Sequence, residues 1–173
     1  MIRVFLLGSL CAGLLATPAL ADAANLLGVF GNWSAFSTGT GSSLTCYAMS
    51  TPKAKRPASL KRTNPFLMVS DWPGRKIKSE PSINPGYEYK ANVPVYLGVG
   101  GEKFEFFSRN DGKSGSAWLR NLNENSKLIS ALSGGVSAVA SGTATTKNTK
   151  TVDTYSLAGF SEAMTKVHAA CQS

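Results

Sequence analysis

The sequence predicts an all-β sandwich that carries two short helices. Short runs rich in β-branched and aromatic residues fill most of the chain, and glycine, proline or asparagine turns separate them. Apolar residues recur at helical spacing in two segments, 124–132 before the last strands and 157–170 at the C-terminus. Many short strands with so few helices are typical of a two-layer β-sandwich.

The chain begins with a predicted secretory signal peptide, residues 1–21. Arg3 supplies a positive charge, an apolar run follows, and Ala19-Leu20-Ala21 is a small-residue cleavage motif. The apolar run is too short to span a bilayer comfortably. Cleavage near Ala21 leaves 22–173 as a single domain. We therefore expect a periplasmic, outer-membrane-associated or secreted protein with peripheral rather than integral membrane association.

Cysteine usage fits this compartment. Cleavage removes Cys11, and Leu10 before it argues against a lipoprotein signal. Cys46 and Cys171 remain, and an oxidising compartment favours a disulfide between them, with two free thiols as the alternative. The only histidine, His168, lies close to Cys171 in sequence, but two possible ligands do not make a zinc site. We expect no metal and no cofactor.

The first half of the domain is mostly extended. Predicted strands are Val29–Phe36, Leu44–Met49, Phe66–Val69 and Lys76–Glu80. Residues 52–64 are too polar for the core and predict a loop, and 71–74 predict a turn at Pro73. Lysines at both ends of 76–78 and Glu80 predict an exposed edge strand, where charge discourages pairing with other chains.

The second half contains the clearest hairpin. Runs 95–99 and 103–107 flank Gly100-Gly101, which accepts the positive φ of a tight turn. A short strand at 116–119 and the 124–132 helix follow. Strands 136–145 and 149–155 are then joined through Lys147-Asn148, because asparagine tolerates the left-handed conformation. The apolar stripe of the 157–170 helix predicts core packing.

The net charge of +8 is concentrated in one segment. Its five cations are Lys53, Lys55, Arg56, Lys61 and Arg62. Such a cluster favours an anionic partner, either an unknown protein or an anionic envelope component such as lipopolysaccharide or phospholipid. Export argues against nucleic acid as the partner. The alternative is a solvated loop that keeps the protein soluble.

The stretch VDTYSLAGFSEAM (152–164) joins the last strand to the last helix. Ser156 is predicted to cap that helix by accepting a backbone N–H two or three residues on. A nucleophile elbow needs glycine two residues on either side of its serine, and neither Ser156 nor Ser161 has both. Ser161 and His168 are about 10 Å apart along a helix, too far for a nucleophile and its base. We therefore expect no catalytic residues.

Two alternative functions remain open. The first is a small-ligand module for a sugar or an aromatic compound, with a cleft lined by Trp72, Tyr87, Tyr89, Tyr96 and Trp118. Ordinary core or hairpin packing is the favoured explanation of each of these rings. The second is a hydrolase with an acid–base pair in a cleft, drawn from Asp71, Glu80, Asp111 and Asp153.

Seven motifs, in this order, resemble those of the invasion-associated locus B family. They are GNWSAF (31–36), CYAMSTPK (46–53), FLMVSDWPGRKIKSEPSINPGY (66–87), KFEFF (103–107), SAWL (116–119), ISALSGG (129–135) and DTYSLAGF (153–160). The resemblance covers most of the predicted mature chain. Its most specific signal is DTYSL-x-GF followed by a cysteine.

The resemblance implies an immunoglobulin-like β-sandwich exported by a Gram-negative bacterium and linked to invasion of host cells, especially erythrocytes. It implies no enzymatic activity and carries over no catalytic residues. Typical members have Asp where Asn32 stands and Arg-Gly where Lys147-Asn148 stands, which puts any partner contact of that turn in doubt. Some members also carry a cysteine near the position of Phe36. Its absence here leaves only the Cys46–Cys171 pairing.

Overall fold

The computed structural model describes residues 23–172, so the predicted signal peptide and Cys11 lie outside the described residues. Within this range the all-β prediction is confirmed, because one antiparallel sheet of 11 strands carries two α-helices. The strands are β1 (Asn25–Phe30), β2 (Trp33–Thr38), β3 (Thr45–Ser50), β4 (Ala54–Arg56), β5 (Phe66–Trp72), β6 (Ile77–Asn84), β7 (Val95–Val99), β8 (Glu102–Asn110), β9 (Gly115–Leu119), β10 (Ser137–Thr143) and β11 (Lys150–Ser156). The helices are α1 (Asn125–Gly134) and α2 (Phe160–Ala170), and the 3-10 turns are η1 (Gly41–Ser43), η2 (Pro73–Arg75), η3 (Leu122–Glu124) and η4 (Thr146–Asn148).

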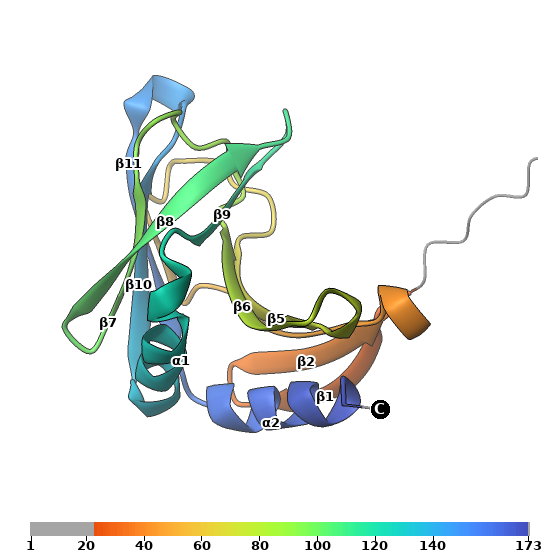
Figure 1. Ribbon diagram of the computed structural model, residues 1–173. Coiled ribbons are helices and arrows are strands. Elements are labelled where there is room, and N and C mark those ends of the chain that lie inside the picture. The colour runs from red at the N-terminus through yellow and green to blue at the C-terminus, as the bar shows by residue number, and fades with distance from the viewer. Residues whose placement is uncertain (1–22, 173) are drawn as a thin grey trace, which may run out of the picture.

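The sheet turns back on itself without closing. Its order is β1-β2-β3-β5-β6-β9-β8-β7-β10-β11-β4, so β1 and β4 are its two edges. Figure 1 shows β10 and β11 upright while β1 and β2 cross at the foot of the molecule, and the two halves of the sheet face each other. The halves join at β6 and β9 through only two register pairs, Ser82↔Trp118 and Ile83↔Ala117. This joint is the narrowest connection between the halves.

The core fills the space between the two halves. Its largest fully buried side chains are Trp33, Tyr89, Tyr155, Phe104, Phe106, Phe160, Leu67, Ile83, Leu97, Leu119, Leu128 and Leu132. Burial of a large aliphatic or aromatic side chain typically stabilises a fold by about 1.5–3 kcal/mol. The core therefore draws on strands from both halves and on α1.

Helix α2 lies across β1, β2 and β3 at the end of the sandwich (Figure 1). Its predicted apolar stripe packs inward, since Phe160, Met164 and Val167 are buried. The rings of Phe160 and Trp33 meet edge to face, with their centroids 4.9 Å apart. Among residues 23–172, no helix combines the length and the apolar composition needed to cross a membrane.

The predicted hairpin at Gly100-Gly101 is confirmed. Both glycines have positive φ, and β7 pairs with β8 through five register positions. Phe104 and Phe106 point into the core. The second predicted turn also forms, since Lys147 and Asn148 both have φ of 53°.

The predicted strand 29–36 is wrong as a single strand. The chain reverses at Gly31-Asn32, so β1 ends at Phe30 and β2 begins at Trp33. Both halves of the run favour β structure, and the Gly-Asn pair between them supplies the turn. Gly31 has φ of 55°, a left-handed conformation that favours glycine.

The predicted edge strand 76–80 and turn 71–74 also need correction. Strand β6 lies between β5 and β9, well inside the sheet. The charged side chains of this interior strand lie on its outward face. Lys78 is exposed, whereas the neighbouring Ser79 and Pro81 are buried. Asp71 belongs to β5 and is buried, so the turn begins only at Pro73. The actual edges are β1 and β4, and β4 is a three-residue strand within the predicted loop 52–64.

Candidate functional site

The junction between β11 and α2 is built around Gly159 rather than Ser156. The prediction that Ser156 caps α2 is wrong, because the helix begins at Phe160 and its N-cap residue is Gly159, with φ of 91°. The predicted hydrogen bond itself is present, because the Ser156 hydroxyl accepts the N–H of Ala158, two residues on, at 3.3 Å. A Cβ at position 159 would lie 1.8 Å from the Phe30 carbonyl oxygen. The junction therefore touches the β1–β2 turn directly.

The nearby serine and histidine have separate partners. Ser161 donates its hydroxyl to the Ser133 carbonyl oxygen at 3.4 Å. His168 Nδ1 lies 2.7 Å from Asp71 Oδ2, and Asp71 Oδ1 accepts the Ser79 N–H at 2.8 Å. The pair of Asp71 and His168 thus sits where α2 meets β5, and it ties the helix to the sheet.

The predicted disulfide between Cys46 and Cys171 is present. It connects β3 to the residue that follows α2, 125 positions later in the chain. Within residues 23–172, no group of three or more histidine, cysteine, aspartate or glutamate side chains is arranged to hold a metal ion.

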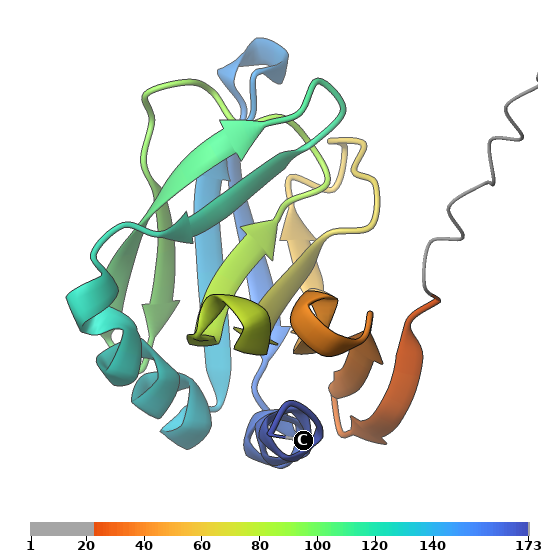
Figure 2. The same cartoon turned by 45° about the vertical axis from the view of Figure 1, so that its right-hand side comes forward.

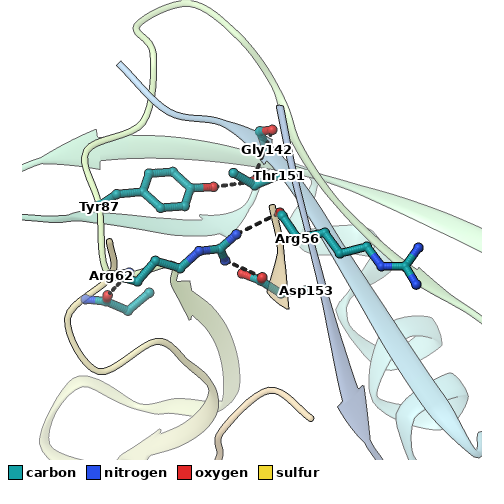
Figure 3. Close-up of polar contacts among 8 residues, drawn as sticks. Arg56, Arg62, Tyr87, Gly142, Thr151 and Asp153 are labelled. Carbon is teal, nitrogen blue, oxygen red and sulfur yellow. Dashed lines mark hydrogen bonds and ion pairs between the residues drawn. The ribbon is translucent and has the colours of Figure 1, made fainter. Parts of the chain in front are cut away.

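One of the five predicted anion-binding cations is buried. Figure 3 shows Arg62 reaching under β11, where its guanidinium pairs with Asp153 and Nη2 donates to the Arg56 carbonyl oxygen at 2.8 Å. The Arg62 and Asp153 side chains are only 2% and 4% exposed. Arg62 is therefore wrongly assigned to an external binding site, and it clamps the segment 56–62 to the sheet.

The clamp continues into a chain of hydroxyls. The Arg62 guanidinium carbon lies 5.4 Å from the centre of the Tyr87 ring. The Tyr87 hydroxyl bonds to Thr151 Oγ1, which itself donates to the Gly142 carbonyl oxygen at 3.2 Å (Figure 3). Because the Thr151 proton goes to Gly142, Tyr87 is the donor in its bond to Thr151.

Burial dominates the ionisation of this cluster. It raises the pKa of Asp153 above its ordinary value, and the attraction of Arg62 offsets only part of that shift. It raises the pKa of Tyr87 to about 12 and also raises the pKa of Tyr89 and of Tyr155. These groups stay neutral or paired inside the protein, as a structural network does.

The other four cations of the predicted site, Lys53, Lys55, Arg56 and Lys61, are exposed. We call these four residues the basic segment. Strand β4 carries Lys55 and Arg56, which lie opposite Asp153 and Val152 of β11. The Lys53 N–H donates to the Thr154 carbonyl oxygen at 2.7 Å. The backbone of Lys53, Lys55 and Arg56 is thus fixed to the sheet, while the charged ends of all four side chains remain in solvent.

The predicted five-ring cleft does not form. Tyr87 and Tyr89 are buried in the core and meet edge to face, with centroids 5.4 Å apart. Tyr96 lies on the outer face of β7, where the Lys103 ammonium sits 3.6 Å from its ring centre. Trp72 and Trp118 do come together, because both line the same pocket.

This pocket, which we call the groove, has a volume of about 710 Å³ and opens where β6 and β9 separate. Its aromatic side chains are Trp72, Phe107 and Trp118; its cations are Arg75, Lys78, Arg109 and Arg120; its acid is Glu80. The two tryptophans were predicted as lining residues, whereas Phe107 and the arginines were not. Arg75 comes from η2, Phe107 and Arg109 come from β8, and Arg120 directly follows β9, so only the folded joint brings them beside β6.

The four acidic residues of the hydrolase alternative do not form an acid–base pair in one cleft. Asp71 and Asp153 are buried in the two clamps described above. Asp111 is exposed, and its carboxylate accepts the N–H groups of Lys113 and Ser114 in a turn. Of the four, Glu80 lines the groove.

Comparison with known proteins establishes the fold. No family model and no curated protein sequence matches this chain. Among solved structures, it is similar to the crystal structure of invasion associated protein B from Bartonella henselae. The two share 15% sequence identity at a TM-score of 0.55, over 88% of this chain and 100% of the other. The chain thus has a fold similar to that of invasion associated protein B, which supports the expected resemblance at the level of the fold alone.

Proposed function

We propose that this protein is an exported, non-enzymatic interaction protein of the bacterial envelope, whose basic segment holds a phosphate-bearing anionic surface. The observation that carries the proposal is that all four cations are exposed, with Lys53, Lys55 and Arg56 on backbone that is hydrogen-bonded to β11 and Lys61 next to the buried Arg62. Clustered cations raise the local concentration of anions and speed their encounter. A solvated loop would need no such attachment.

The attachment comes from both sides of the segment. Strand β4 adds to the free edge of β11, and the Arg62 guanidinium binds the Arg56 carbonyl oxygen from below. Ordering the backbone of these cations in advance reduces the conformational entropy lost on binding. In this proposal, the buried pair of Arg62 and Asp153 holds the backbone that carries the exposed cations, and it does not contact the partner itself.

Export and the absence of catalysis rest on separate support. A disulfide between Cys46 and Cys171 fits an oxidising compartment, and one solved structure of similar fold is an invasion associated protein. His168 is bonded to Asp71 at the helix–sheet contact, away from Ser161, so the residues of a serine hydrolase do not converge.

The test is binding of the mature, disulfide-intact protein to phosphatidylcholine vesicles with and without phosphatidylglycerol, across a salt series. We expect binding only to the anionic vesicles, weakening as salt screens the charges. The variant K53Q/K55Q/R56Q/K61Q should bind at least about tenfold more weakly.

A charge-matched control separates the segment from net charge. Lys90, Lys113, Lys150 and Lys166 are exposed on other elements, and K90Q/K113Q/K150Q/K166Q removes the same charge. This control should bind like the unchanged protein. Equal loss in both variants, or binding that salt does not affect, would remove the basic segment from the proposal.

A further inference from the structure

The groove is a second candidate site, separate from the basic segment in both residues and chemistry. Beyond their two register pairs, Ser82↔Trp118 and Ile83↔Ala117, strands β6 and β9 diverge (Figure 2). Ile77 of β6 and Leu119 of β9, which line the groove, lie on that side of the pairs. Ser79, with φ of 56°, bends β6 just before that joint. The backbone itself therefore opens the groove, and side chains from η2, β8 and η3 complete its walls.

The walls are mainly apolar and aromatic. Phe107 and Trp118 form a tilted pair with centroids 5.9 Å apart, and Trp72 lines the same space. Ile77, Pro81 and Leu122 add aliphatic surface. Flat aromatic faces of this kind favour stacking with a planar ring system. The volume of about 710 Å³ is within the usual range for sites that bind small molecules.

Two arginine side chains pack against the aromatic rings of the groove. The Arg75 guanidinium carbon lies 5.4 Å from the Trp72 ring centre, and that of Arg109 lies 5.9 Å from the Phe107 ring centre. Both guanidinium groups are thus held beside the apolar walls, where an anionic group of a bound molecule would meet them. Arginine recognises carboxylate and phosphate groups through paired N–H donors.

The charge balance of the groove remains positive after its acids are counted. Four cations line it: Arg75, Lys78, Arg109 and Arg120. Glu80 lines it as well, and Glu105 pairs with Arg120 at 2.6 Å. Two cations more than acids are left, so the groove complements an anion.

Two residues that line the groove each have a buried polar atom that could form a hydrogen bond with a ligand. Trp72 Nε1 and Asn125 Oδ1 have no hydrogen-bond partner within the described part of the chain. One is a donor and the other an acceptor. A ligand with both an anionic and a polar group would offer partners to this wall after small side-chain movements.

We propose that the groove binds a planar, mainly apolar organic anion, one or two aromatic rings bearing a carboxylate, sulfonate or phosphate, with the rings against Phe107 and Trp118 and the anion at Arg75 and Arg109. An acidic sugar fits less well, because the polar side chains of this groove are mostly cations and the rest of its walls are apolar and aromatic. The proposal does not depend on the basic segment.

Tryptophan fluorescence provides the measurement. Of the chain's three tryptophans, Trp72 and Trp118 line the groove while Trp33 is buried in the core. We expect 2-naphthoate to quench most of the accessible tryptophan signal and 2-naphthol, which is uncharged at neutral pH, to bind about tenfold more weakly. Equal binding of the two compounds, or tighter binding of glucuronate, would overturn the proposal.

Substitutions of the two arginines test whether 2-naphthoate binds in the groove. R75Q/R109Q should weaken 2-naphthoate binding about tenfold, whereas R56Q/K61Q, from the basic segment, should not change it. Conversely, R75Q/R109Q should keep most of the vesicle binding of the proposed function. These two readouts separate failure of the groove from failure of the basic segment.

A second pair of variants avoids any risk to folding. Leu122 is 75% exposed beside the groove, and Val136 is 88% exposed at the far end of α1. L122E places a negative charge beside the bound anion and should weaken naphthoate binding at least about threefold. V136E should leave binding unchanged. Equal effects of the two substitutions would contradict the proposed site.

Discussion

Cys46 and Asp71 are register partners on the adjacent strands β3 and β5, and each holds the last turns of α2. Cys46 forms the disulfide with Cys171, while Asp71 Oδ2 lies 2.7 Å from His168 Nδ1. The C-terminal helix is thus attached at two neighbouring points of one sheet, once covalently and once through a buried carboxylate. Because α2 covers β1, β2 and β3, this attachment stabilises the end of the sandwich.

Removal of the disulfide should destabilise the protein strongly. The bond closes a loop of 125 residues, and the chain-entropy model gives an upper value of about 4–5 kcal/mol for such a loop. We expect C46A/C171A to lose several kcal/mol of unfolding free energy in urea. Reduction of the unchanged protein should give a similar loss. A loss below about 1 kcal/mol in both experiments would show that the other helix contacts suffice.

The contact of His168 with Asp71 should appear as a coupling energy. Asp71→Asn weakens two interactions of a buried carboxylate and should cost about 1–3 kcal/mol, whereas His168→Gln should cost about 1 kcal/mol. The double variant should cost less than the sum by at least about 0.5 kcal/mol. Urea unfolding of the four proteins measures this cycle, and strict additivity would mean that the two side chains act independently.

The parts of the fold that sequence predicted well depend on local signals. The β7–β8 hairpin has alternating phenylalanines and a Gly-Gly turn, and these determine its register without help from the rest of the chain. The α2 stripe is similarly local. The Cys46–Cys171 bond was predictable because the predicted cleavage near Ala21 would remove Cys11 and leave one pair.

The parts that sequence predicted wrongly depend on distant partners. Arg62 lies within a run of exposed cations, and nothing local distinguishes it, since its partner Asp153 is 91 residues away. Strand β6 carries charges that suggest an edge, yet β9 pairs with it from the other half of the sheet. The groove likewise needs η2 and β8 side by side, which only the sheet order produces.

Gly159 should be the least replaceable residue of the DTYSLAGF motif. It has φ of 91°, and an added Cβ would lie 1.8 Å from the Phe30 carbonyl oxygen. Gly159→Ala should therefore cost about 3 kcal/mol or more, or prevent folding. The matched control is Gly134→Ala, where an added Cβ meets nothing within 4 Å, and its effect should stay within about 1 kcal/mol. Thermal unfolding of both variants compares them, and similar melting temperatures would contradict this role.

The buried tyrosines should make the protein sensitive to alkali. Burial raises the pKa of Tyr87 to about 12 from 10.0, and it also raises the pKa of Tyr155. A raised folded-state pKa means that the stabilisation is fully present below pH 10 and is lost as pH rises toward the folded-state pKa. We expect phenolate absorbance from these tyrosines to appear together with unfolding, rather than before it.

Tyr155→Phe tests this assignment. The Tyr155 hydroxyl is buried without a hydrogen-bond partner in the described structure, so its removal should change stability at pH 7 by less than about 1 kcal/mol. The same variant should move the alkaline unfolding midpoint to higher pH. Tyr87→Phe, by contrast, loses the bond to Thr151 and should be less stable at neutral pH. An unchanged alkaline midpoint in Tyr155→Phe would exclude its ionisation as a cause of unfolding.

Two aspartates should show opposite pH dependence. Burial raises the pKa of Asp153 above 3.8, whereas hydrogen bonds from the Ser114 and Lys113 N–H groups lower the pKa of Asp111. For Asp153 the folded state binds more protons than the unfolded state, so its contribution to stability falls as pH rises from 3.8 through the folded-state pKa. For Asp111 the contribution is present above pH 3.8 and is lost as pH falls through the lowered pKa.

Urea unfolding from pH 3 to pH 8 of the unchanged protein, Asp153→Asn and Asp111→Asn measures both differences. The stability of the unchanged protein relative to Asp153→Asn should decrease with rising pH, and relative to Asp111→Asn it should increase. A relative stability that instead rises with pH for Asp153 would mean that the attraction of Arg62, not burial, controls this carboxylate.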